Sequence, residues 1–313
     1  MPMGTPGWTL MPATRSLLPH SGAQFEENEN LESRVQMAKL LAVSTNVHRL
    51  EVWFMMKRYG RQRRSRLLEG KVAVITGAAA GIGAAIAHLF GEEGAHVFVL
   101  DLNGSRAAAV AEYIRTRGGS GFSLLADVRK PETVQAAIGH ALKQFGRIDI
   151  LVNNAGIYPR KPFLEMSEQE WDDVQETNLK GVFHCTKAVL PQMVERAAGK
   201  IVNISSVTFF KGLANLTHYV AAKGGVIGFT RSLAREMGPN KIYVNCITPG
   251  AIEVETEKLV ATPDQIAAIV NQQSLQRRLT PLDVARVCLF LASHLSDGLS
   301  GQTINVDGGL VMH

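Results

Sequence analysis

The fold of this 313-residue chain is constrained most by short apolar runs that alternate with stretches of helical periodicity. The first run, Val72–Thr76, leads into a glycine-rich turn and a helical stretch that ends near Gly94. Strands that are apolar throughout are covered on both faces, and strands that alternate with helices form parallel sheets. We therefore expect an α/β fold with a doubly wound, parallel, seven-stranded sheet and helices on both faces. The six later strands are expected near 95–101, 121–126, 148–152, 200–204, 243–247 and 303–306.

Helices are expected in the stretches between these strands. Pro131 and Glu132 are residue types that favour the first turn of a helix, and they open one over 131–146. The other expected helices lie near 104–117, within 168–197 and over 217–237.

The charge of the chain separates residues 1–66 from the rest. This segment holds ten of the 33 Lys and Arg residues and five of the 28 Asp and Glu residues, so residues 67–313 contain 23 of each. A neutral domain speaks against binding to nucleic acid, because a basic face is the usual footprint of such proteins. We expect one catalytic domain over 67–313. Residues 1–66 are interpreted as a disordered extension or a mis-assigned start, with a targeting or interaction tail as the third possibility.

Cysteine usage and hydropathy favour a cytoplasmic protein. Cys185, Cys246 and Cys288 are widely spaced, which predicts reduced thiols and neither a disulfide framework nor a zinc site. No cluster of metal-ligating residues is visible, so no metal is expected. The chain has no run of 18 apolar residues and no signal-peptide pattern at its beginning, so neither a membrane span nor secretion is predicted.

The turn after the first strand has the pattern of a phosphate-binding loop. Gly77 permits a tight turn, Gly81 lets the backbone approach a pyrophosphate, and Gly83 lets the helix pack close to the strand. The helix that follows presents free N–H groups and the positive end of its dipole to an anion. The pattern therefore predicts a dinucleotide site.

The end of the second strand indicates which dinucleotide binds. Asp101 follows Gly83 by eighteen residues, where a carboxylate can accept hydrogen bonds from ribose hydroxyls and would repel a 2′-phosphate. This favours NAD over NADP. Arg106, five residues further on, is the residue that would favour NADP. Two further turns, Asp127-Val128 and Asn153–Gly156, follow strands at the same expected edge of the sheet.

A second group of residues has the pattern of an acid–base site. Tyr219 and Lys223 are four residues apart and would share a helix face, and Ser206 lies thirteen residues before the tyrosine. Charges ~4 Å apart at an effective dielectric of ~20 interact by ~4 kcal/mol. At ~1.4 kcal/mol per pKa unit, the lysine could lower the pKa of the phenol from ~10 to roughly 7. A phenol with such a pKa is a general acid or base.

Taken together, these motifs resemble the short-chain dehydrogenase/reductase family over residues 67–313. The resemblance implies a Rossmann-type fold, a nicotinamide cofactor and a homotetramer. The motifs that carry it are Thr76–Gly83 (including Ile82), Asn153–Gly156, Asn178, Ser206, Tyr219-x-x-x-Lys223, Pro249-Gly250 and Gly301–Gly309.

The resemblance also implies roles for individual residues. Tyr219 would transfer the proton, Lys223 would assist it and hold the nicotinamide ribose, Ser206 would position the reacting oxygen, and Asn178 would support a water linked to Lys223. The implied cofactor contacts are Gly77, Gly81, Ile82, Gly83, Asp101, Asp127, Val128, Asn154, Ala155, Gly156, Tyr219, Lys223, Pro249, Gly250 and Ile252. The family often has a threonine about five residues after the proline of Pro249-Gly250, but this chain has Val254 there and Thr256 beyond it.

The function expected from these features is NAD-dependent interconversion of a small-molecule alcohol, secondary or cyclic/aromatic, and its carbonyl compound. Tyr158 and Phe209 are candidate substrate contacts because they lie next to motif residues. One alternative is a 3-oxoacyl-[acyl-carrier-protein] reductase that uses NADPH. An alternative of another class is a non-catalytic dinucleotide-binding sensor or scaffold.

Overall fold

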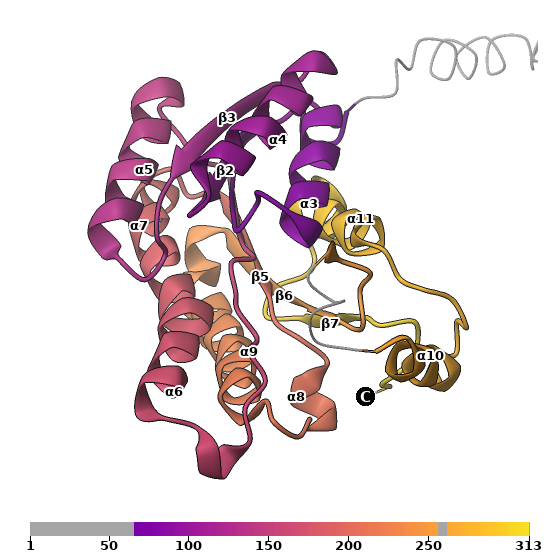
Figure 1. Ribbon diagram of the computed structural model, residues 1–313. Coiled ribbons are helices and arrows are strands. Elements are labelled where there is room, and N and C mark those ends of the chain that lie inside the picture. The colour runs from indigo at the N-terminus through magenta and orange to yellow at the C-terminus, as the bar shows by residue number, and fades with distance from the viewer. Residues whose placement is uncertain (1–65, 256–261, 313) are drawn as a thin grey trace, which may run out of the picture. The chain divides into compact units, whose positions relative to one another are not determined.

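The computed structural model describes residues 66–255 and 262–312 (Figure 1). Within them, seven parallel strands form one sheet in the order β3-β2-β1-β4-β5-β6-β7. The expected fold class is confirmed. The strands are β1 Val72–Thr76, β2 His96–Asp101, β3 Ser120–Leu125, β4 Ile150–Asn153, β5 Gly199–Ile204, β6 Ile242–Pro249 and β7 Thr303–Val306. The expectations for residues 1–65 and for Thr256 lie outside the described residues.

Helices cover both faces of the sheet (Figure 1). The cluster on one face includes side chains from α3 (Gly81–Glu92), α4 (Gly104–Thr116) and α11 (Pro281–Ala292). The opposite face is covered mainly by α5 (Pro131–Phe145), α7 (Gly181–Glu195) and α9 (Thr217–Met237). The remaining helices are α6 Glu168–Gln175, α8 Thr208–Lys211 and α10 Pro263–Gln272, with short turns η1 Phe163–Glu165, η2 Glu176–Lys180, η3 Gly238–Asn240 and η5 His294–Ser296.

Alternating side chains of β1 explain how one strand serves two hydrophobic cores. Ala73 and Ile75 belong to the cluster under α3 and α11, whereas Val72 and Val74 belong to the cluster under α5 and α7. Successive side chains of a strand point to opposite faces, so a strand between two helical layers must be apolar at every position. Full burial of the valine and isoleucine side chains contributes about 1.5–3 kcal/mol each.

The structure contains three helices that were not expected: α8, α10 and α11. The beginning of α11 carries a clear sequence signal. Pro281 is its first residue, and the Asp283 carboxylate accepts hydrogen bonds from the backbone N–H (2.8 Å) and hydroxyl (3.0 Å) of Thr280. The stretch 168–197, expected to be helical, is divided by η2, which is a π-helical turn.

All three cysteines are buried free thiols. No helix within residues 66–255 or 262–312 has both the length and the apolarity needed to cross a membrane. The same residues contain no group of three or more His, Cys, Asp or Glu side chains arranged to hold a metal ion.

Candidate active site

The glycine turn between β1 and α3 leaves no room for side chains at two positions. Gly77 has a φ of +61°, and a Cβ added there would lie 2.7 Å from the Cα of Ala155. A Cβ at Gly83 would lie 2.4 Å from the Gly77 carbonyl oxygen and 2.6 Å from Nδ2 of Asn154. These glycines are therefore required by the close approach of the turn after β4.

Hydrogen bonds join that turn to the end of β1. Asn154 Nδ2 donates to the carbonyls of Thr76 (3.0 Å) and Gly77 (2.9 Å). The Thr76 hydroxyl accepts from the backbone N–H groups of Asn154 (2.9 Å) and Ala155 (3.0 Å). Two predicted cofactor-binding turns are thus held together as one unit.

The residues around this unit fit a dinucleotide. The first turn of α3 contains no acidic residue, and Ala80 supplies no side-chain cap for its N–H groups, so an anion can accept from them. The Asp101 carboxylate lies beside the turn, where it accepts from the backbone N–H of Ala79 (3.0 Å) and of Asn103 (2.9 Å). A ribose hydroxyl bound near the turn could donate to the same carboxylate.

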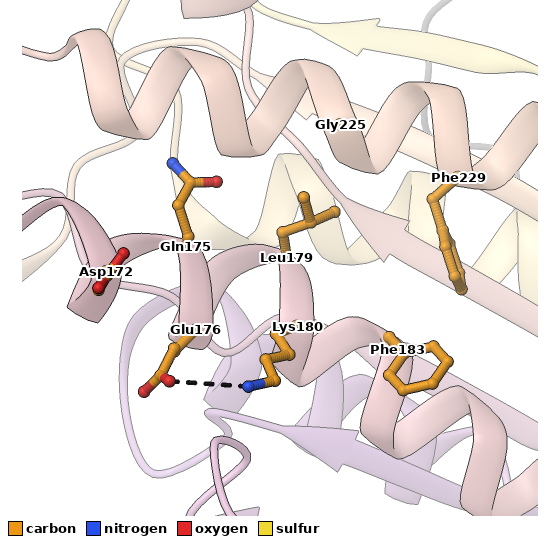
Figure 2. A pocket seen from close by; sticks show the side chains of 8 residues that line it. All are labelled: Asp172, Gln175, Glu176, Leu179, Lys180, Phe183, Gly225 and Phe229. Carbon is orange, nitrogen blue, oxygen red and sulfur yellow. Dashed lines mark ion pairs between the residues drawn. The ribbon is translucent and has the colours of Figure 1, made fainter.

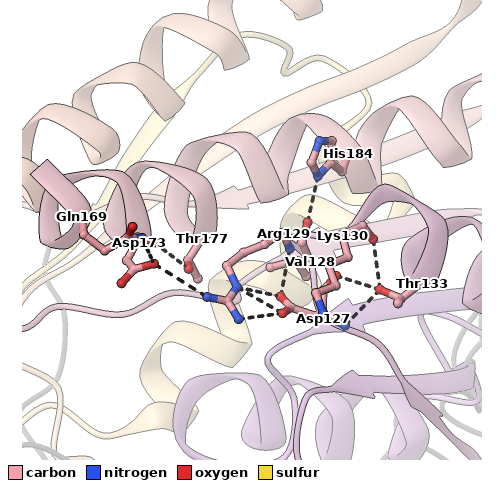
Figure 3. Close-up of polar contacts among 9 residues, drawn as sticks. All are labelled: Asp127, Val128, Arg129, Lys130, Thr133, Gln169, Asp173, Thr177 and His184. Atoms are coloured by element: carbon pink, nitrogen blue, oxygen red, sulfur yellow. Dashed lines mark hydrogen bonds and ion pairs between the residues drawn. The ribbon is translucent and has the colours of Figure 1, made fainter.

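Asp127 is held in a network that sequence reasoning did not predict (Figure 3). Its carboxylate accepts from Nε (3.0 and 3.1 Å) and Nη2 (2.7 Å) of Arg129, which holds the pKa of Asp127 below its usual value. Arg129 also lies 3.9 Å from a carboxylate oxygen of Asp173 in α6. The neighbouring Val128 is buried, and its carbonyl accepts from Nδ1 of His184. Arg129 thus ties the predicted adenine border to α6.

The three residues predicted for acid–base chemistry converge where β5 ends and α9 begins. Tyr219 and Lys223 both lie on α9, and the Lys223 ammonium is 5.7 Å from the centre of the Tyr219 ring. The Ser206 side chain is close enough to Tyr219 to lower its pKa. Lys223 is 4% exposed and donates to the Ile204 carbonyl at 2.8 Å.

The expected lowering of the Tyr219 pKa to near 7 is wrong for this structure. Burial raises the pKa of Tyr219 to about 12, and the neighbouring Ser206 side chain opposes this only in part. Burial also lowers the pKa of Lys223 to about 8. The cost of desolvating both groups outweighs their mutual attraction, because the ammonium faces the Ile204 carbonyl and lies some distance from the phenol.

Asn178 lies fully buried within the π-helical turn η2. Its amide donates to the carbonyls of Ile157 (2.8 Å) and Val174 (3.0 Å), and its Oδ1 accepts from the Ile157 N–H at 3.2 Å. A Cβ at Gly156 would lie 2.4 Å from this Oδ1 and 3.5 Å from the Lys223 ammonium. Asn178, Gly156 and Lys223 therefore meet at one point, and π-helical turns are frequent at functional sites.

The two candidate substrate residues lie differently. The ring of Tyr158 is centred 6.0 Å from that of Tyr219, so it borders the acid–base cluster. The Phe209 ring packs on α9 at Gly224, where an added Cβ would lie 2.7 Å from it. Phe209 is 43% exposed.

The segment after β6 lies against the glycine turn. Gly250 packs against the backbone of Asp307, and Ile252 is buried and pairs with Leu279. Val254, which replaces the expected threonine, lies against the glycine turn: its Cγ1 is 3.3 Å from the position of a Cβ at Gly81.

Sequence reasoning missed a polar chain at the centre of the sheet. Asn153 Nδ2 donates to Oδ1 of Asn203 (2.8 Å) and to the hydroxyl of Thr186 (3.1 Å). Asn203 Nδ2 in turn donates to the Thr230 hydroxyl at 2.9 Å. A detectable signal existed, since asparagine is unusual in strands that are otherwise apolar. This network of hydrogen bonds joins β4, β5, α7 and α9, the last of which carries Tyr219 and Lys223.

A large hollow lies elsewhere, on the outer side of α6, η2, α7 and α9 (Figure 2). It has a volume of about 670 Å³, and Phe183 and Phe229 face it from two different helices. Its lining residues are Asp172, Gln175, Glu176, Leu179, Lys180, Phe183, Gly225 and Phe229, and none of them is a predicted catalytic residue.

Known proteins are similar in sequence to this chain along most of its length. A family model described as enoyl-(acyl carrier protein) reductase matches residues 77–311. The chain belongs to the short-chain dehydrogenase/reductase family. Its described fold and its glycine turn are those of an oxidoreductase that uses a nicotinamide dinucleotide.

Individual relatives are similar over the same region. The 3-oxoacyl-[acyl-carrier-protein] reductase FabG of Vibrio cholerae is 41% identical over 245 residues, which cover 78% of this chain and 99% of the relative. FabG of Staphylococcus aureus is 42% identical over 77% of this chain and 98% of its own length. A solved 7α-hydroxysteroid dehydrogenase complexed with NADH is 35% identical, with a TM-score of 0.77, over 80% of this chain and 97% of that chain.

Proposed function

We propose that this protein is an NADH-preferring reductase that converts a 3-oxoacyl thioester into the 3-hydroxyacyl thioester. The observation that carries the proposal is the convergence of Tyr219, Ser206 and Lys223 beside the glycine turn and Asp101 at one edge of the sheet. A ketone held there would lie next to both a proton donor and a coenzyme site.

Each side chain of the cluster has a distinct task. A nicotinamide coenzyme held at the glycine turn and Asp101 would supply the hydride for the carbonyl carbon. Tyr219 donates its phenolic proton to the carbonyl oxygen, which balances the hydride and yields the alcohol. Ser206 donates a hydrogen bond to the same oxygen while negative charge develops on it. Lys223 stabilises the phenolate that remains, and Asn178 holds the loop at Ile157 in register beside it.

The substrate class is supported by the relatives. FabG proteins of several bacteria are 41–42% identical over nearly their whole length, and their name states reduction of a 3-oxoacyl group. This similarity favours the reductase alternative over the general alcohol dehydrogenase expected from the sequence. An acyl carrier protein is the carrier named for these relatives, and a thioester on such a carrier is the substrate proposed here.

The coenzyme preference rests on residues of this chain. Asp101 lies beside the glycine turn, and positions 77–83 contain no lysine or arginine. Arg106, the nearby cation, is paired with Glu255 at 2.6 Å. Among the described residues at this edge, a 2′-phosphate would therefore meet the Asp101 carboxylate and a guanidinium that is already paired.

The test measures the reduction of 3-oxoacyl thioesters of increasing chain length with NADH and with NADPH. The reaction is monitored by the absorbance of the reduced nicotinamide. We expect turnover with NADH at higher efficiency than with NADPH, and its loss in the Tyr219→Phe variant. Failure of both coenzymes with every thioester would overturn the substrate assignment. A higher efficiency with NADPH would overturn the coenzyme assignment alone.

A second candidate is a dehydrogenase of cyclic secondary alcohols. The similarity to the hydroxysteroid dehydrogenase and the aromatic ring of Tyr158 next to Tyr219 favour it. Oxidation of cyclic alcohols by NAD, without reduction of thioesters, would select this function. Coenzyme binding without turnover of either class would instead support the sensor alternative.

We also propose the homotetramer that the family resemblance implies. Phe183 is 44% exposed, and together with Leu179 and Phe229 it gives the hollow of Figure 2 an apolar floor. An exposed apolar surface of this kind is typical of a subunit contact.

A further inference from the structure

One ion pair crosses the coenzyme edge of the molecule and is unrelated to the acid–base cluster. Arg106 in the first turn of α4 binds Glu255, 149 residues away, with Nη2 2.6 Å from Oε2. The residue before Glu255 is Val254, whose side chain packs against the glycine turn at Gly81. The segment 254–255 therefore passes over the turn and reaches the beginning of α4.

Arg106 is close to the carboxylate that marks the ribose site. The Asn103 N–H donates to Oδ1 of Asp101 at 2.9 Å, and Oδ1 of Asn103 accepts from the Arg106 N–H at 3.1 Å. One short turn thus links Asp101 to Arg106. A guanidinium at this position is suited to a phosphate group, because its N–H donors match the geometry of phosphate oxygens.

We propose that Glu255 strengthens the preference for NADH by keeping Arg106 away from a 2′-phosphate. The inference rests on the NADH preference proposed above. Glu255 acts in two ways: it binds one guanidinium nitrogen, Nη2, and it adds a second negative charge to an edge that already holds Asp101. With Glu255 present, these three side chains carry a net charge of −1, and replacing Glu255 by glutamine makes them neutral.

The size of the effect is limited by solvent. The side chains of Arg106 and Glu255 are 53% and 72% exposed, and pairs this exposed change equilibria by only about two- to five-fold. The freed guanidinium gains a charge-assisted bond to phosphate, which is stronger than a neutral one. We therefore expect the affinity for NADPH relative to NADH to rise roughly three- to ten-fold in Glu255→Gln.

Direct binding of NADH and NADPH to the full chain, measured by calorimetry, tests the proposal independently of turnover. Glu255→Gln is expected to tighten NADPH and to leave NADH within about two-fold. Adding Arg106→Gln should cancel the gain, because the gain depends on that guanidinium. Glu112→Gln is the matched control: it removes the same charge from an ion pair with Arg115 on the same helix. We expect it to change neither affinity.

The outcomes separate this inference from the proposed function. Equal changes for both coenzymes in Glu255→Gln, or a gain that persists without Arg106, would overturn the role of Glu255. If Glu255→Gln bound both coenzymes with an unchanged ratio of NADPH to NADH affinity, the role of Glu255 would also be overturned. If the wild-type protein bound neither coenzyme, the proposed function would fall and the inference with it.

Discussion

Burial of charge governs the chemistry of the site at the level of single residues. Lys223 lies almost entirely out of water, and its ammonium has the Ile204 carbonyl as acceptor. A lysine with a pKa of about 8 loses its charge at a lower pH than an ordinary lysine, so the charge beside Tyr219 depends on pH just above neutrality. The sequence predicted that Tyr219 and Lys223 lie on one helix, as they do on α9. It could not predict these pKa values, because desolvation depends on the packing of distant parts of the chain.

Replacing Tyr219 by phenylalanine tests its role as the proton donor. The change removes the hydroxyl but keeps the ring, so we expect turnover to fall by about 10²-fold or more. Coenzyme affinity should remain within about two-fold, because Asp101 and the glycine turn are untouched. Steady-state rates and calorimetry measure the two effects. A variant that keeps most of its rate would assign the proton to another group.

Replacing Lys223 by methionine tests the cost of the buried ammonium. The folded-state pKa of about 8 lies below the ordinary 10.5, so between these values the unfolded chain holds a proton that the folded chain lacks. Stability conferred by this residue must therefore rise with pH across that window. At ~1.4 kcal/mol per pKa unit, the rise totals roughly 3 kcal/mol.

Urea unfolding at pH 7.5 and pH 10 provides the measurement. The free energy of unfolding of the wild type, minus that of Lys223→Met, should increase between the two pH values. A difference that is constant or that decreases with pH would show that the ammonium is well solvated in the folded protein.

At the level of helices and strands, local patterns were sufficient wherever periodicity was clear. Residues 217–237 were expected to be helical and coincide with α9, and β7 was also placed correctly. The missed helix α11 carried its signal in the capping pair Thr280 and Asp283. The π-helical turn at Asn178 could not be predicted, because it depends on contacts between Asn178 and the loop at Ile157.

The close packing of α3 against the turn after β4 leads to a prediction with a control in the same molecule. In Gly83→Ala, the new methyl group would overlap the Gly77 carbonyl and the Asn154 amide. We expect a loss of about 1–3 kcal/mol in stability and weaker coenzyme binding. Gly139 in α5 has open space around its Cα, so Gly139→Ala should raise stability by about 0.5–1 kcal/mol.

Denaturant unfolding and coenzyme titration distinguish these effects. If Gly83→Ala were as stable as the wild type and bound coenzyme equally well, the close approach would not be required. A destabilised Gly139→Ala would mean that its helix face is covered.

At the scale of the whole molecule, we propose that the hollow of Figure 2 is a subunit contact of the homotetramer. Placing a carboxylate on its floor with Phe183→Glu should desolvate a charge in the contact and yield smaller species. Tyr113→Glu is the matched control, because Tyr113 is similarly exposed (42%) but lies on α4. Light scattering after gel filtration gives the masses. Equal masses for the wild type and Phe183→Glu would place the contact elsewhere.

The π-helical turn at 176–180 serves the site and not that outer surface, as a single deletion would reveal. A π turn holds one residue more than an α turn, so it absorbs the extra residue and leaves the helix beyond it in phase. Removing one residue there would produce an uninterrupted helix in which Phe183 still lines the hollow of Figure 2. The hydrogen bonds between Asn178 and Ile157 would be lost, because they depend on the widened turn. One surplus residue thus sets where Asn178 points without changing which stripe of α7 a neighbouring subunit could meet.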